Sequence, residues 1–258
     1  MRTGPWVSLL VLSLLLGCAH RTRPDPAVVA RLERVALVAR ALRPPVAYVG
    51  RGDPEAHAGE APKALDARLE TDLSRAVTPF EVEETLGEAV RAALPEPPPW
   101  EIPPALEVAS ALGLLLARSD EPRWSALEPL GIDAVLDLAI EGWGLWDPPG
   151  RARPPGLWME VRARLLRLPA AEPLWEGRVR VGPPDEPGPR LDVSRFEADP
   201  APVLREGMER LTRRVAERLL GLLGLCGEAA CAGGGSGGDG GTAYPPRGIR
   251  TRRTRSAQ

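Results

Sequence analysis

The chain has 258 residues with 33 basic and 35 acidic side chains, so its formal net charge is −2. This near balance excludes the strong global field that draws basic proteins to nucleic acid, and we expect no nucleic-acid partner. The two histidines, His20 and His57, lie in polar sequence. Histidine is the commonest metal ligand and general base, so we expect no metal, no cofactor and no histidine catalysis.

The N-terminal residues predict a targeting signal. A single basic residue, Arg2, precedes an apolar run from Val7 to Leu16. A membrane-spanning helix needs about 20 apolar residues, so this shorter run is typical of a removed signal peptide. The tetrapeptide that follows, Leu15-Leu16-Gly17-Cys18, resembles the lipobox of bacterial lipoproteins.

The lipobox resemblance implies that residues 1–17 are removed and that Cys18 carries acyl chains such as palmitate. Two or more chains hold a protein stably on a bilayer, since each buried methylene contributes about 0.8 kcal/mol. Ala19 and His20 differ from the aspartate that retains many lipoproteins in the inner membrane. The resemblance therefore favours the outer membrane, facing the periplasm. An ordinary secretory signal with a chance cysteine is the alternative.

Composition divides the rest of the chain into three parts. Residues 18–27 predict a tether, and residues 28–231 a single α/β periplasmic domain. Residues 232–258 predict a disordered tail, because a Gly-rich stretch leads into a segment with five arginines. That arginine-rich end is either a solvated tail or an electrostatic grip on anionic lipopolysaccharide or a partner protein.

The remaining cysteines, Cys226 and Cys231, form a possible disulfide, which is the natural state of such a pair in an oxidising periplasm. Two unpaired thiols are the alternative. The spacing does not match a zinc site, since there is no second pair.

The first half of the domain predicts mostly helices. Asp25-Pro26 either begins a helix that continues to residue 42, or Arg34 to Ala41 form a strand. Helices are expected over 62–76 and over 79–94, the second opened by the capping box Thr78-Pro79-Phe80-Glu81. A buried helix over 105–117 and a short helix over 124–130 follow, with a possible short strand at 100–102.

The second half predicts three strands and a closing helix. Over 132–141, 157–165 and 175–181, every second residue is apolar, and the charged residues fall at the positions between them. Three such strands in succession are typical of an antiparallel meander with helices on one face and water on the other. An amphipathic helix from Asp199-Pro200 to Leu222 closes the domain. The predicted fold class is α+β, a two-layer domain with a largely antiparallel sheet and helices packed on one face.

Residues 131–224 also resemble the C-terminal half of envelope lipoproteins of the curli-secretion and penicillin-binding-protein-activator type. The matching segments are Gly131-Ile132-Asp133-Ala134-Val135-Leu136, the strand from Trp158 to Leu168, and Leu174-Trp175-Glu176-Gly177. The resemblance implies a non-enzymatic role in which the domain docks onto an envelope protein or self-associates.

Three tryptophans, Trp143, Trp146 and Trp158, flank the Pro- and Gly-rich loop over 147–156. Exposed tryptophans are enriched in interaction hot spots, so these are possible partner contacts. Burial at the sheet edge is the alternative reading of all three.

A hydrolase and a carrier are the two alternatives to an interaction module. Asp133, Asp137 and Glu141 share one strand face, and a carboxylate pair about 5 to 10 Å apart can act as acid and base in a hydrolase. Arginines on neighbouring strands are expected to neutralise them instead. A lipid or small-ligand carrier would use the space between sheet and helices. The sequence favours a membrane-anchored envelope lipoprotein that is not an enzyme.

Overall fold

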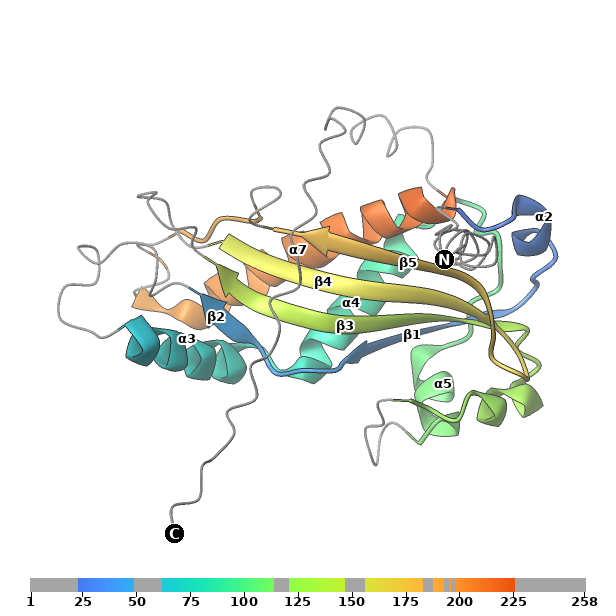
Figure 1. The fold of residues 1–258 in the computed structure, drawn as a ribbon, viewed down its shortest axis with the longest axis horizontal. Helices are drawn as coiled ribbons and strands as arrows, with labels where there is room; N and C mark the ends of the chain where they lie inside the picture. Colours follow the sequence, from blue (N-terminus) through green and yellow to red (C-terminus); the bar gives the residue numbers. More distant parts are fainter. Residues whose placement is uncertain are drawn as a thin grey trace, which may run out of the picture.

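A single mixed sheet organises the chain in the computed structural model (Figure 1). The structure describes residues 23–48, 62–113, 121–146, 156–182, 188–192, 195 and 198–225. Helices pack against this five-stranded sheet, which confirms the predicted α+β fold class. The lipobox, the two C-terminal cysteines and the arginine-rich tail lie outside the described residues, so the predictions made for them remain predictions.

The predicted antiparallel meander is present. It consists of β3 (Ala134–Trp146), β4 (Gly156–Arg167) and β5 (Glu172–Val181), with β4 paired to both neighbours. The register of β3 against β4 shifts between Ile140 and Gly142. The alternation of apolar and polar residues places the apolar side of each strand in the core, as a half-buried sheet requires.

Two further strands extend the sheet on the other side of β3. Both β1 (Val35–Ala41) and β2 (Val46–Tyr48) pair with β3 in parallel. The strand alternative for this region is confirmed, and a continuous helix is wrong: the helix that Asp25 caps is the short α2 (Pro26–Val29). Glycine at position 144 allows β2 to pair closely with β3, because a Cβ there would lie 1.8 Å from the carbonyl oxygen of Val46.

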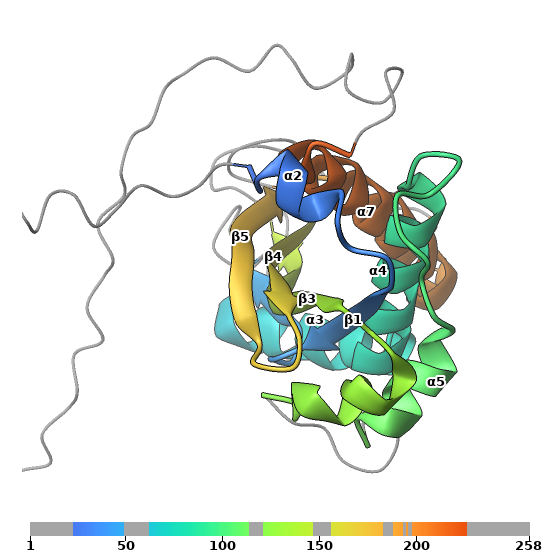
Figure 2. The same cartoon turned by 90° about the vertical axis from the view of Figure 1, so that its right-hand side faces the viewer.

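Three helices cover one face of the sheet, as predicted. They are α3 (Pro62–Ala76), α4 (Pro79–Ala93) and α7 (Pro200–Leu223). Figure 2 looks along the strands and shows α4 and α7 together on this side. The space between them and the sheet, where a carrier would hold its cargo, is filled by side chains that include Leu73, Leu86, Leu138, Ile140, Met159, Val161, Leu211 and Val215.

The opposite face is partly covered, where the sequence predicted water. Here lie α5 (Ala105–Ala111) and a 3₁₀ helix, η2 (Trp124–Leu130). The helix predicted over 105–117 is shorter than expected, and only Val108 within it is buried. These elements form a second apolar cluster with Ala36, Val38, Val108, Trp124, Leu127, Ile132, Val135 and Leu166.

The capping box of α4 generates a prediction about acid stability. The Thr78 N–H donates to the Glu81 carboxylate over 2.7 Å. The pKa of Glu81 is lowered first by this backbone bond and then by the Thr78 hydroxyl, because both favour the charged carboxylate. Its stabilisation is therefore present above the unfolded pKa of about 4.3 and is lost as pH falls through the folded pKa.

We expect Glu81→Gln to destabilise the protein by about 0.3–1 kcal/mol at pH 7, the usual contribution of a negative charge in a first helical turn. The difference should vanish in urea unfolding near pH 2, where the wild-type carboxyl is also neutral. Glu88→Gln, in the C-terminal half of the same helix, is the control and should show no loss at either pH. A pH-independent loss in Glu81→Gln contradicts the assignment to charge.

Candidate functional site

A buried ion cluster ties three strands together on the face opposite α4 and α7. Asp137 of β3 is fully buried and accepts two hydrogen bonds from Arg40 of β1, at 2.9 and 3.0 Å. Arg164 of β4 donates to the same carboxylate at 2.7 Å. Burial opposes the charge on Arg164, but hydrogen bonding and attraction to Asp137 outweigh it and raise the arginine's pKa.

The other two predicted carboxylates, Asp133 just before β3 and Glu141 within it, are also engaged. Asp133 accepts the backbone N–H groups of Glu33 and Arg34, both at 2.9 Å. Glu141 lies 3.0 Å from Arg162 and 2.8 Å from Arg178, two arginines that directly oppose each other across β4 and β5. The predicted neutralisation by arginine is confirmed for Asp137 and Glu141, which removes the support for a carboxylate acid–base pair. Within the described ranges, no three His, Cys, Asp or Glu residues are arranged to hold a metal ion.

The three predicted contact tryptophans lie at different depths. Trp143 is fully buried and donates its indole N–H to the carbonyl of Arg43. Trp158 is 8% exposed and lies 5.6 Å beneath the guanidinium of Arg180. These two positions favour burial at the sheet, the alternative reading. Trp146 is half-buried, and much of the loop that the tryptophans flank is outside the described residues.

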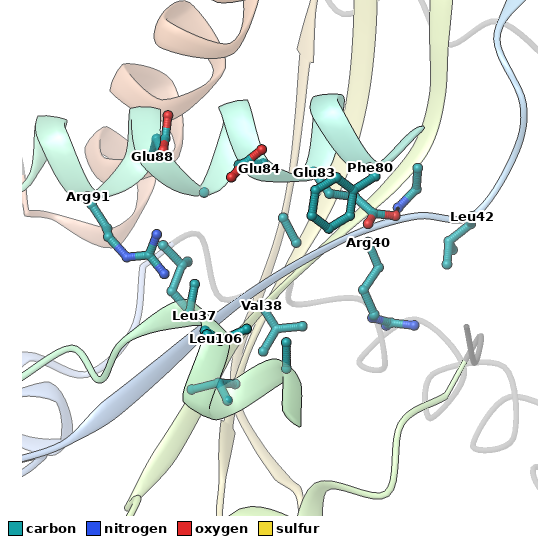
Figure 3. A pocket seen from close by; sticks show the side chains of 16 residues that line it. Leu37, Val38, Arg40, Leu42, Phe80, Glu83, Glu84, Glu88, Arg91 and Leu106 are labelled. Carbon is teal, nitrogen blue, oxygen red and sulfur yellow. Dashed lines mark hydrogen bonds between the residues drawn. The ribbon is translucent and has the colours of Figure 1, made fainter. Parts of the chain in front are cut away.

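A groove lies at the edge of the sheet, along β1. It has a volume of about 360 Å³, and β1 passes between α4 on one wall and α5 on the other (Figure 3). Phe80 of α4 is 56% exposed and Leu106 of α5 is 70% exposed. They are the two large apolar side chains exposed in the described part of the chain, and both line this groove. Exposed apolar groups gathered at one place are a common feature of interaction surfaces.

The backbone at the floor of the groove is only partly paired. The Leu42 N–H donates to the carbonyl of Ile140 in β3 over 3.0 Å. Since backbone groups alternate along a strand, the odd-numbered residues of β1 direct theirs away from β3, toward the groove. At the ends of β1, the Val35 N–H donates to the Glu101 carbonyl at 2.9 Å and the Ala41 N–H to the Glu83 carboxylate at 2.7 Å.

Between these ends, the N–H groups of Leu37 and Ala39 have no hydrogen-bond partner within the residues that the structure describes. Both residues line the groove. A sheet edge with free N–H groups is a template for another strand. The floor of the groove thus offers two adjacent donors on one edge.

The chain itself begins to pair with this edge and then leaves it. Glu101 forms an isolated parallel bridge with Arg34, and its N–H donates to the Glu33 carbonyl at 2.8 Å. This bridge lies in the short strand predicted at 100–102. The chain then turns away through Pro103-Pro104 into α5. The edge therefore accepts a parallel neighbour at one end and stays open beyond it.

The charge of the groove comes mainly from α4. Glu84 and Glu88 are exposed and line the groove, together with Glu83 and Arg91. Arg40 also lines it, but Asp137 neutralises this arginine. The wall formed by α4 is therefore acidic, while α5 contributes the apolar residues Ala105, Leu106, Val108 and Ala109.

Sequence reasoning did not identify this groove. The available signal was the position of Phe80 and Leu106, which are large apolar residues outside the buried stripes of their helices. A residue off the stripe is expected to be exposed. The position of two such residues beside a particular strand edge depends on tertiary structure. The sequence pattern was therefore not sufficient to predict the groove.

Comparisons with known proteins identify no family. No family model matches the chain, and no curated protein matches it. Among solved structures, the chain is similar to lipoprotein GNA1162 of Neisseria meningitidis, with 13% identity, 67% of this chain and 94% of that chain covered, and a TM-score of 0.34. The C-terminal domain of LpoB from Salmonella enterica has 12% identity, 69% and 98% coverage, and a TM-score of 0.28.

A hypothetical protein from Chlamydia trachomatis, CT253, is similar at 12% identity, with 78% of this chain and 99% of that chain covered and a TM-score of 0.38. Of these three structures, GNA1162 is described as a lipoprotein. In the described residues, no helix is long and apolar enough to cross a membrane.

The ion cluster predicts unequal effects of two similar substitutions on one strand. Asp137→Asn removes the buried carboxylate charge that pairs with Arg40 and Arg164, and breaking a buried pair costs about 3–5 kcal/mol. Glu141→Gln removes a half-exposed charge, and exposed pairs contribute about 0–1 kcal/mol. We expect chemical denaturation to show a several-fold larger loss of unfolding free energy for Asp137→Asn.

The double variant Arg40→Met, Asp137→Leu separates charge from packing. It removes both buried charges, and apolar replacement of a buried pair is often close to neutral. It should therefore be more stable than Asp137→Asn alone. If the double variant is the less stable of the two, the cluster stabilises through its shape and hydrogen bonds rather than through charge balance.

Proposed function

We propose that the chain is a membrane-anchored envelope lipoprotein that acts as a non-enzymatic interaction module. In this proposal, the groove along β1 binds an extended segment of a partner protein in the periplasm. The observation that carries the proposal is the pair of unpartnered N–H groups, at Leu37 and Ala39, on the floor of an apolar groove. Strand addition to such an edge is a common mode of peptide recognition.

The two walls define the chemistry of the partner segment. Side chains of an added strand point alternately to the two faces of the sheet, so they would alternately meet α4 and α5. The acidic residues Glu84 and Glu88 on α4 favour basic side chains, while Leu106 on α5 favours apolar ones. The expected ligand is an extended segment in which basic and apolar residues alternate.

The anchor is the second part of the proposal, and it is supported by the lipobox resemblance at Cys18. If Cys18 is acylated, Cys18→Ser should abolish labelling by a clickable fatty acid and release the protein from the membrane fraction. Cys226→Ser is the matched control and should leave both properties unchanged. A Cys18→Ser protein that stays membrane-bound after a salt wash contradicts the anchor, because its membrane association would then need neither acyl chains nor charge.

Photo-crosslinking tests the groove as the binding surface. We would place p-benzoylphenylalanine at Leu106 in intact cells, with Ala64 on the exposed side of α3 as the control position. One envelope protein should be captured from Leu106 and not from Ala64. Capture by itself is insufficient, so the crosslink must also depend on the strand edge.

Ala39→Pro supplies that dependence, because it removes one of the two outward N–H donors and proline is tolerated on edge strands. We expect the Leu106 crosslink to fall at least about tenfold, the effect of losing roughly 1.4 kcal/mol of binding. Thermal unfolding checks that the variant folds. If Ala39→Pro is unstable, Glu84→Arg tests the same surface from an exposed position. An undiminished Leu106 crosslink in both variants excludes strand addition. If the crosslink is lost only in Trp146→Ala, the interface lies at the loop flanked by the tryptophans instead.

A further inference from the structure

The C-terminal segment of the chain has the composition that the groove selects. Residues 248–255 read Gly-Ile-Arg-Thr-Arg-Arg-Thr-Arg. From Ile249 to Arg252, β-branched residues alternate with arginines, and β-branched residues favour extended structure. We propose that this segment docks in the groove of its own chain, where it competes with the partner segment. The inference rests on the proposed function.

The two walls of the groove explain the fit. On a strand added to β1, Arg250 and Arg252 share one face and Ile249 and Thr251 share the other. One register places the arginines toward Glu84 and Glu88 of α4 and the β-branched residues toward α5. The backbone carbonyls of the docked segment would accept hydrogen bonds from the N–H groups of Leu37 and Ala39. Charge, side-chain alternation and backbone pairing thus select the same segment.

The connecting chain is long enough for this contact. Twenty-three residues separate Leu225, the last described residue, from Ile249. Fully extended, they reach about 75 Å, whereas a domain of about 200 residues has a radius of gyration of about 16 Å. A Gly-rich coil of this length spans about 25 Å on average, which corresponds to a local concentration in the millimolar range. Docking in cis is therefore favoured over docking onto a second copy.

Hydrogen exchange at β1 tests the contact in the intact mature protein. We would measure amide exchange of Leu37 and Ala39 by NMR, since docking protects both amides. At a local concentration of about 1 mM and an affinity of about 100 μM, protection is about tenfold. Replacing all five tail arginines by serine should remove it. Unchanged exchange in the serine variant overturns the proposal.

Charge reversal provides the matched test. Glu84→Arg with Glu88→Arg should remove the protection, and changing the five tail arginines to glutamate in that background should restore it. Glu128→Arg with Glu209→Arg reverses two exposed acidic residues that do not line the groove, and should leave protection intact. Loss in this control, or no restoration by the glutamate tail, contradicts specific docking.

Dilution separates docking in cis from docking in trans. Protection that is constant from 10 to 500 μM protein, a range of roughly fifty-fold, supports the intramolecular contact, because mass action affects only association between chains. Protection that falls on dilution assigns the groove to a second copy and overturns the proposal. The proposed function can fail separately. If the tail protects the β1 amides but no edge-dependent crosslink forms at Leu106, the binding of a partner protein is refuted. If the crosslink forms but the tail gives no protection, only the docking of the tail is refuted.

Discussion

The buried contact between Asp137 and Arg40 is the interaction on which the groove depends. Removing these two charges from water costs several kcal/mol per ion, which only close geometry and full hydrogen bonding offset. The paired bonds at 2.9 and 3.0 Å meet this condition and join β1 to β3. Arg40 also lies 5.6 Å from the ring of Trp124, so one side chain connects the edge strand, the central strand and η2. The floor of the groove is fixed by this contact.

The alternation of β1 assigns opposite tasks to neighbouring residues. Even-numbered residues such as Val38 and Arg40 pair their backbone with β3 and direct their side chains toward α5 and η2. Odd-numbered residues such as Leu37 direct their side chains into the main core and their backbone toward the groove. The side chains that anchor β1 are thus separate from the backbone groups that remain open. Glu83 and Glu101 occupy the two ends of the edge, which limits the uncontrolled strand pairing that exposed edges invite.

Local patterns predicted most of the elements, while non-local contacts produced the site. The helices over 62–76 and 79–93 and the three-strand meander follow from periodicity and capping, which are properties of short windows. The parallel pairing of β1 with β3, and of β2 with β3, depends on the path of a long connection, which periodicity does not encode. Asp137 and Glu141 occupy equivalent polar positions in the strand pattern, yet one is fully buried and the other half-buried. The difference arises because η2 and α5 cover only one end of that face.

The small size of the open edge sets the strength of what it binds. Two N–H donors and the carbonyls beside them form few hydrogen bonds, each contributing about 0.5–1.5 kcal/mol. Contact with Phe80 and Leu106 adds apolar burial, but the association entropy opposes both. The balance corresponds to an affinity in the millimolar to micromolar range, where 1 mM equals about −4.1 kcal/mol. A surface of this affinity is substantially occupied only by ligands that are held at a high local concentration. Tethering, of the domain to a membrane or of the tail to the domain, provides that local concentration and makes a short edge sufficient.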